Sequence, residues 1–235
     1  MRYAIYFTPP PHHALSHAAA AWLGRNAFSG ELVDAPAVLG LTLQEIAYYT
    51  ALPRRYGFHA NLKAPFRLAT GKTEAMLLKE LMLFSGAMEP FRLPPLDVVR
   101  LSNGYRLAPA GPDEFLDRLA ASVVQGFDHF RAPLTEAEIE RRDPDSLTAA
   151  QFANLHRWGY PYVMDEFRFH MMLTGAINSV DGPRIERALR DHFGPVLSVP
   201  LDISSIALFA EEENGSPFRV HSLHPVGRVD QRRIA

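Results

Sequence analysis

The pattern of hydrophobic and polar positions divides this chain of 235 residues into short strands and helices. Runs rich in aromatic and β-branched residues that end at proline or glycine clusters are typical of strands. Such runs predict strands over residues 2–8, 58–68 and 166–177. A hairpin is predicted over residues 96–109, because Asn103-Gly104 stands between two apolar runs. A last pair of strands is predicted on the two sides of the turn ENGSP.

Helical composition, with glycine or proline at the ends of several segments, predicts five longer helices. These helices cover residues 13–24, 42–50, 73–88, 112–130 and 182–194. The polar stretch over residues 132–161 is also helix-prone and predicts short helices that join two halves of the chain. Within it, the segment ERRDPD is typical of a solvated turn.

Two histidine-centred pentapeptides, FHANL at 58–62 and FHMML at 169–173, lie 170 − 59 = 111 residues apart. Each is followed by a predicted helix, then by the triplet PLD, then by a predicted hairpin. The interval from histidine to the aspartate of PLD is 97 − 59 = 38 in the first case and 202 − 170 = 32 in the second. Two short matches in the same order indicate a diverged internal duplication.

The duplication predicts a pseudo-two-fold α+β fold, which we expect as a single domain over residues 1–235. The first repeat half is expected at roughly 50–130 and the second at 160–228, with strand 2–8 and helices 13–24 and 42–50 added. We expect two antiparallel sheets that are flanked by helices.

In an extended strand, residues i, i+2 and i+4 share one face. His59, Asn61 and Lys63 are therefore expected on one face of the first histidine strand. In the second strand, His170 shares a face with Thr174. If the two strands lie side by side about a two-fold axis, both histidines line the same cleft.

A pair of histidines suits the cleavage of a phosphoester, in which one group takes a proton and another gives one. Histidine titrates near neutrality, so one imidazole can be neutral while the other is protonated. Asn61, Lys63 and Thr174 are donors that could hold the non-bridging phosphate oxygens. This chemistry requires no metal and no cofactor, and we expect neither. The expected partner is a small phosphorylated or cyclic-phosphate substrate.

The segments FHANLKAPF and FRFHMMLTG resemble the paired H-x-T/S-h motifs (h, hydrophobic) of the two-histidine phosphoesterase superfamily, which includes the RNA 2′,3′-cyclic phosphodiesterases, formerly called 2′-5′ RNA ligases. RYAIYFTPP and YGFHANLKAPFRLA are similar to its branch in bacterial phosphonate-utilisation operons. The resemblance spans nearly the whole chain, although only the two histidine segments are specific. It implies a bilobal fold with a central cleft, and it implies that His59 and His170 act as acid and base.

The chain departs from the family motif at the residue two positions after each histidine. Asn61 stands where threonine or serine is usual, and its amide can still donate a hydrogen bond. Met172 stands at the matching place in the second motif and has no donor. The alternative to an enzyme is therefore a phosphate-ligand binding protein with weakened or lost catalysis. An enzyme acting on RNA ends is a third possibility.

Several other residues are candidates for ligand contact. Tyr6 and Tyr56 are either site aromatics or core residues, and Arg54 lies in a loop-like segment just before the histidine strand. His13 and His17 share a helical face, but no acidic residue follows at metal-ligand spacing, so no metal site is predicted. The segment ATGKT at 69–73 lacks the first glycine of a phosphate-binding loop.

Composition adds limits to these expectations. A net charge of −2 makes extended nucleic acid an unlikely partner, because no broad positive surface is implied. The chain has no cysteine, which removes thiolate chemistry and fits a reducing compartment. No apolar run reaches the ~20 residues of a membrane span. We therefore expect a cytoplasmic location, no membrane, and no obligate protein partner.

Overall fold

The computed structural model describes residues 1–227, so the last residue of the predicted second half, 228, lies outside the described part. The strands are β1 (Arg2–Phe7), β2 (Ala60–Phe66), β3 (Phe91–Arg92), β4 (Leu96–Leu101), β5 (Gly104–Pro109), β6 (Met171–Met172), β7 (Asp202–Ile203), β8 (Ser205–Glu211) and β9 (Arg219–Pro225). The α-helices are α1 (Ala14–Leu23), α2 (Leu43–Tyr56), α3 (Glu74–Gly86), α4 (Glu114–Gly126), α5 (Glu136–Glu140), α6 (Ala149–Trp158) and α7 (Gly182–Leu197). Short 3₁₀ helices cover Asp128–Phe130 (η1), Pro144–Ser146 (η2) and Met164–Glu166 (η3).

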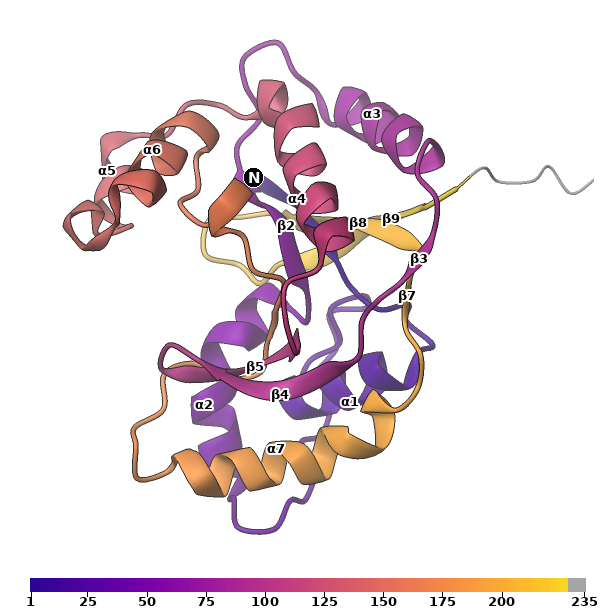
Figure 1. The fold of residues 1–235 in the computed structure, drawn as a ribbon, viewed down its shortest axis with the longest axis vertical. Helices are drawn as coiled ribbons and strands as arrows, with labels where there is room; N and C mark the ends of the chain where they lie inside the picture. Colours follow the sequence, from indigo (N-terminus) through magenta and orange to yellow (C-terminus); the bar gives the residue numbers. More distant parts are fainter. Residues whose placement is uncertain (228–235) are drawn as a thin grey trace, which may run out of the picture.

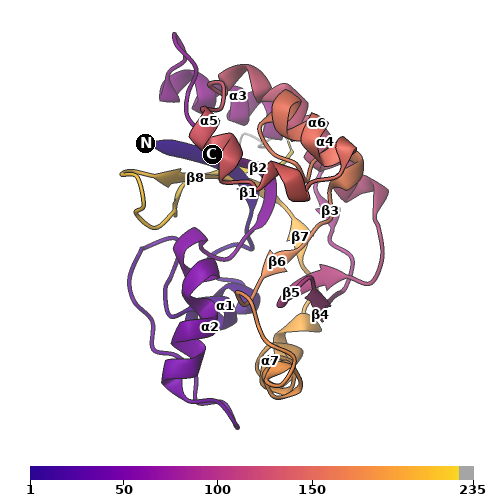
Figure 2. The ribbon, with the colours of Figure 1, turned by 90° about the vertical axis from the view of Figure 1, so that its left-hand side faces the viewer.

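The strands form one seven-stranded sheet, in the order β4-β5-β6-β2-β1-β8-β9, and a separate two-stranded sheet of β3 and β7. All strand pairs are antiparallel. The long sheet narrows at its middle, where β2 and β6 are joined by the single pair Ala60–Met171. Figures 1 and 2 show α3 and α4 beside one part of the sheet and α1, α2 and α7 beside the other. The predicted α+β fold with antiparallel sheets flanked by helices is confirmed.

The order of elements after the two histidine segments is the same. β2 is followed by α3 and the hairpin β4–β5, and β6 is followed by α7 and the hairpin β8–β9. Each hairpin lies beside the histidine strand of the other half. The first hairpin pairs with β6 through β5, and the second is joined to β2 through β8 and β1. In keeping with this exchange, α3 contacts β9 and α7 contacts β4. Such reciprocal packing is what the proposed duplication would produce.

Predicted and observed boundaries differ most in the second histidine strand. A strand was expected over 166–177, but β6 covers only Met171–Met172. After Met172 the backbone leaves strand geometry, because Gly175 donates its N–H to Tyr49 and Ile177 donates to Asn103. The second helix is longer than predicted and runs through Pro53 to Tyr56.

The hairpin β4–β5 turns one residue earlier than predicted. Leu101 pairs with Gly104, so Ser102 and Asn103 form the turn and Gly104 already belongs to the strand. A Cβ atom at Gly104 would lie 2.4 Å from the carbonyl oxygen of Gly175. Glycine is therefore required here by the close approach of another backbone segment and not by the turn.

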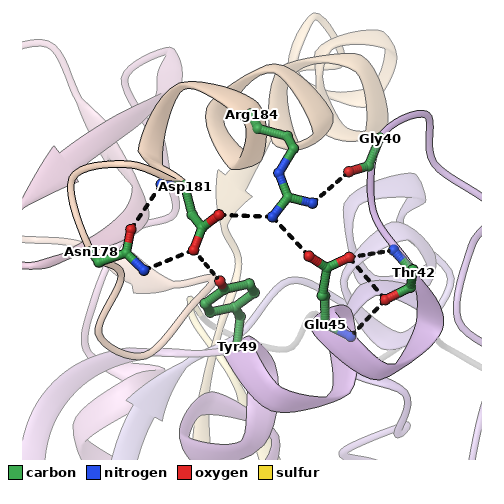
Figure 3. Close-up of polar contacts among 7 residues, drawn as sticks. All are labelled: Gly40, Thr42, Glu45, Tyr49, Asn178, Asp181 and Arg184. Atoms are coloured by element: carbon green, nitrogen blue, oxygen red, sulfur yellow. Dashed lines mark hydrogen bonds and ion pairs between the residues drawn. The ribbon is translucent and has the colours of Figure 1, made fainter.

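A polar network ties the start of α2 to the start of α7 (Figure 3). Arg184 bonds the Glu45 carboxylate at 2.7 Å and the Asp181 carboxylate at 2.8 Å. Asp181 also accepts a hydrogen bond of 2.9 Å from the hydroxyl of Tyr49. Glu45 in turn forms a capping box with Thr42 at the first turn of α2. The network holds α2, and with it the segment that leads into β2, against α7.

Candidate active site

His59 and His170 lie at the narrow middle of the sheet. His59 immediately precedes β2 and His170 immediately precedes β6, and the paired residues Ala60 and Met171 are fully buried. Continuing this antiparallel register places His59 opposite Met172 and His170 opposite Asn61. The two histidines are then diagonal neighbours on one face, and such neighbours are separated by roughly 7–8 Å. The structure thus brings together the two residues that the sequence singled out.

The two imidazoles are held in the same way. The Nδ1 atom of His59 lies 2.9 Å from the carbonyl oxygen of Gly57, and the Nδ1 atom of His170 lies 2.8 Å from that of Arg168. A carbonyl oxygen can only accept, so in both rings Nδ1 carries the proton. The Nε2 atom of each neutral ring is then left with a lone pair. Both histidines therefore present a proton acceptor away from the backbone that fixes them.

Aromatic side chains surround His59. Its ring stacks on Tyr6 with a centroid distance of 3.7 Å and an interplanar angle of 19°. The ring of Phe209 lies 6.0 Å away and that of Tyr56 lies 6.4 Å away. Tyr6 and Phe209 belong to a small buried cluster on the face of β1 and β8 that carries His59. Tyr6 and Tyr56, both candidates from the sequence, thus lie beside the first histidine.

These surroundings keep both imidazoles neutral near neutral pH. Burial and, after it, the charge of His170 lower the pKa of His59, against the hydrogen bond to Gly57, which raises it; the resulting pKa is about 4. Burial also lowers the pKa of His170, against the hydrogen bond to Arg168, and the charge of Arg106 lowers it again. The electrostatic effect of His170 on His59 agrees with their placement as neighbours.

Asn61 lies on the same side of β2 as His59. It pairs with Tyr6 of β1, and its Oδ1 atom is buried without a hydrogen-bond partner among the described residues. Burial raises the pKa of Tyr160, whereas the charge of Arg142 and the side chain of Asn61 act to lower it. A buried polar atom without a partner is uncommon, and here it lies next to the two histidines.

Lys63 does not lie on the face of His59, and the prediction that it does is wrong. Its Nζ atom is buried and bonds Asp128 at 3.1 Å and the carbonyl of Val124 at 3.3 Å, on the side of β2 covered by α4. The cause is a β-bulge in the pairing of β1 and β2 between Ile5–Lys63 and Tyr6–Asn61. One extra residue breaks the alternation of faces, so Asn61 and Lys63 point to opposite sides.

The prediction that Thr174 shares a strand face with His170 and contacts the ligand is also wrong. It is fully buried, accepts the N–H of Tyr105 at 2.9 Å and donates to the carbonyl of Gly175 at 3.0 Å. Because β6 ends at Met172, the assumption of a continuous strand face does not extend to Thr174. Its hydroxyl holds the β5–β6 connection together and is not available to a ligand.

The guanidinium of Arg54 is engaged within the helices. It donates to the carbonyl of Leu23 in α1 and to the hydroxyl of Thr50 in α2. Arg54 therefore links these two helices, and its contacts do not include the histidines. The prediction that it touches the ligand is not supported by this placement.

Arg106 in β5 was missed in the sequence. It pairs with Met172, so its side chain leaves the sheet on the face that also carries His170. Its Nη1 atom donates to the carbonyls of Tyr105 and Thr174 at 2.9 and 3.0 Å, and burial lowers its pKa. No carboxylate pairs with Arg106 in the described part of the chain. The sequence signal that could have indicated Arg106 is a charged residue within the otherwise apolar strand GYRLAP.

Residues 1–227 contain neither a candidate metal site nor a candidate membrane-spanning helix. No group of three or more His, Asp or Glu side chains in this range could hold a metal ion. No helix in the same range is both long enough and apolar enough to cross a membrane.

Comparison with known proteins adds three relationships. The chain is 41% identical over 221 residues to "Ribose 1,5-bisphosphate phosphokinase PhnN" of Janthinobacterium sp. (strain Marseille), covering 92% of this chain and 49% of that protein. It is 34% identical over 220 residues to the protein of the same name from Laribacter hongkongensis (strain HLHK9), covering 94% and 50%. The chain therefore spans about half the length of these curated relatives. A solved structure described as "Crystal structure of phosphoesterase" covers 96% of this chain and 98% of its own, with 12% identity and a TM-score of 0.40.

Residues 61–219, more than half of the chain, match a family that is described as "Protein of unknown function (DUF1045)". The match begins at Asn61, two residues after His59, and includes His170. The chain belongs to this family.

Proposed function

We propose that this protein is a two-histidine phosphoesterase that hydrolyses a small cyclic phosphate or phosphodiester without a metal ion. The observation that carries the proposal is the matched pair of imidazoles. His59 and His170 lie on one face of the sheet, and each is fixed through Nδ1, while Nε2 has no hydrogen-bond partner within residues 1–227. When one of the two Nε2 atoms is protonated, a phosphorus atom between them has a proton acceptor on one side and a proton donor on the other.

The reaction follows from this arrangement. One imidazole accepts a proton from the attacking water at Nε2, while the water oxygen bonds to phosphorus. The other, protonated at Nε2, gives its proton to the alkoxide oxygen as the bond from phosphorus to that oxygen breaks. The second imidazole must therefore be charged, although both pKa values are lowered in the free protein. A bound phosphate anion supplies the negative charge that raises the pKa of a neighbouring histidine.

Arg106 is suited to hold the non-bridging oxygens of this phosphate. It lies within electrostatic range of His170 and has no carboxylate partner among the described residues. Only its Nη1 atom is used by backbone carbonyls, so Nε and Nη2 remain for a ligand. A guanidinium matches the oxygens of a phosphate in a bidentate geometry. It would supply the donor that Met172 cannot.

A ribose phosphate ester is the first substrate class to test, because both curated relatives are named for ribose 1,5-bisphosphate. Opening a 1,2-cyclic phosphate of ribose gives a 1-phosphate, which is the kind of group that this name contains. A role of this hydrolysis in phosphonate metabolism would agree with the sequence resemblance. We do not extend the kinase activity to this chain, because ATGKT lacks the first glycine of a phosphate-binding loop and Thr73 within it caps α3.

The test is hydrolysis of ribose 1,2-cyclic phosphates and of 2′,3′-cyclic nucleotides in the presence of EDTA. We expect turnover by the unaltered protein and a loss of roughly 10²–10⁴-fold in His59→Ala and in His170→Ala. His12→Ala, at an exposed histidine outside the site, is the matched control and should keep full activity. Activity that disappears with the chelator, or that survives in His59→Ala, would contradict the proposal.

A second candidate function is a phosphate-ligand binding protein with little catalysis, and Met172 is the observation that favours it. By register Met172 faces His59 across the β2–β6 junction and lies next to Arg106 in β5. If the missing donor limits the rate, Met172→Thr should raise turnover by roughly 10²-fold or more, the usual effect of one oxyanion donor. Unchanged turnover in Met172→Thr would show that the methionine is not the cause of weak activity.

A further inference from the structure

The side chain of Tyr6 lies directly against the first imidazole. Tyr6 pairs with Asn61 across β1 and β2, and directly opposite residues of an antiparallel pair point to the same face of a sheet. On that face the Tyr6 ring stacks on His59, with the ring centroids 3.7 Å apart and the planes at 19°. A tyrosine hydroxyl extends further from the backbone than the nitrogens of an imidazole do. The hydroxyl of Tyr6 therefore projects past the ring of His59.

This hydroxyl has no hydrogen-bond partner within residues 1–227, although Tyr6 is only 1% exposed. The hydroxyl of a buried tyrosine usually finds a partner. In the same range, the polar side-chain atoms that are both unpaired and sealed from water are Arg55 Nε and Asn61 Oδ1. The Tyr6 hydroxyl is not sealed, so it belongs to the small exposed part of its residue. A ligand held next to His59 can reach it.

Arg106 has the equivalent place beside the second histidine. Tyr6 pairs with the residue two positions after His59. Arg106 pairs with Met172, which is two positions after His170. Beside each histidine strand, the neighbouring strand thus places a polar side chain at the matching position, on the face that carries the imidazole. A phosphate between the two histidines would have Arg106 on one side and the Tyr6 hydroxyl on the other.

We infer that the Tyr6 hydroxyl donates a hydrogen bond to a non-bridging oxygen of this phosphate, on the side of His59, and is a further catalytic residue of the proposed phosphoesterase. A neutral hydroxyl can donate to an ionised phosphate oxygen, which only accepts. Burial raises the pKa of Tyr6 well above its ordinary value, so the hydroxyl keeps its proton near neutral pH. The inference deepens the proposed function and rests on it for the roles of the two histidines.

The test is Tyr6→Phe, which removes the hydroxyl and keeps the ring that stacks on His59. In the hydrolysis of ribose 1,2-cyclic phosphate with EDTA present, we expect kcat to fall by roughly 10²–10³-fold, as for the loss of one oxyanion donor, while KM changes much less. Tyr3→Phe is the matched control and should keep kcat, because Tyr3 lies on the same strand but its hydroxyl donates to Glu74.

The melting temperatures of the two variants separate this role from a structural one. Tyr6→Phe removes a hydroxyl that has no partner in the described part of the chain, so it should melt at the same temperature as the unaltered protein or higher. Tyr3→Phe removes a hydrogen bond and should melt at a lower temperature. If the Tyr6 hydroxyl were structural, Tyr6→Phe would melt lower and keep its kcat.

Binding of orthovanadate, measured by calorimetry, does not depend on turnover. Vanadate adopts the five-coordinate geometry of a phosphoryl transition state, and we expect Tyr6→Phe to bind it at least about 10-fold more weakly than the unaltered protein and Tyr3→Phe do. An unchanged kcat in Tyr6→Phe, an unchanged vanadate affinity, or no vanadate binding by the unaltered protein would overturn the inference. Failure of the proposed function looks different, because Tyr6-dependent vanadate binding then remains while the unaltered protein does not hydrolyse the cyclic phosphate.

Discussion

The neutral state of His59 makes the stability of this protein depend on pH in a way that one substitution should remove. The pKa of His59 is about 4 in the folded protein, against about 6.5 for an unperturbed histidine. Between these two values the unfolded chain binds a proton that the folded protein does not. The stability contributed by neutral His59 is thus present above pH 6.5 and is lost as the pH falls toward 4.

The size of the effect follows from the two pKa values. Linkage predicts that this one group lowers the free energy of unfolding by about 2 kcal/mol between pH 7 and pH 5. The His59 ring is partly exposed, so water reduces the effect, and we expect about 1–2 kcal/mol. In urea this corresponds to a shift of the unfolding midpoint of roughly 0.5 M, for a slope of a few kcal/mol per M.

The assay is urea unfolding of the unaltered protein, His59→Gln and His12→Gln at several values between pH 7 and pH 5. Glutamine does not titrate, so His59→Gln should lose less stability than the unaltered protein over this range, by about 1–2 kcal/mol. His12→Gln, at an exposed histidine, should follow the unaltered protein. Parallel curves for the unaltered protein and His59→Gln would refute a neutral, half-buried imidazole at this position.

Two further substitutions test the packing around the site. Lys63→Met should lower the free energy of unfolding by about 1–3 kcal/mol, because Asp128 loses one partner but keeps Arg131. The same variant should keep kcat/KM within about 3-fold of the unaltered protein. A loss of activity at unchanged stability would instead place Lys63 in the site. Gly104→Ala should destabilise the protein by about 1–3 kcal/mol in a thermal melt, because the new Cβ would lie 2.4 Å from the Gly175 carbonyl oxygen. Gly86→Ala is the control and should be neutral or stabilising, because a Cβ there would have no atom within 4 Å. Equal melting temperatures for these two glycine variants would contradict the close backbone approach at Gly104.

The local elements of this protein could be predicted because their signals are local. The strand at the N-terminus, helix α1 with Gly24 in left-handed conformation at its end, and α3 with its Thr73 cap all lie within a residue or two of their predicted bounds. The repeated order of histidine segment, helix and hairpin was also visible, and it led to the two histidines. Each of these inferences uses residues that are close together in the chain.

The composition of the site was decided by contacts between distant segments. Lys63 was misassigned because a single bulge reverses the alternation of faces, and the bulge forms only when β1 pairs with β2. Thr174 was misassigned because the backbone after β6 bonds Tyr49 and Asn103 instead of continuing a strand. Neither event has a signature within the segment itself.

The sequence by itself determined most helices and strands, the α+β class and the two matching histidine segments, since hydrophobic periodicity and the repeated pentapeptide are properties of short segments. Only the tertiary structure decided which polar groups accompany these histidines. Arg106 comes to the face of His170 through the pairing of β5 with β6, and Tyr6 comes to His59 through the pairing of β1 with β2. The physical reason is that a strand fixes the direction of its own side chains, whereas the neighbours they meet depend on which other segments pack beside it.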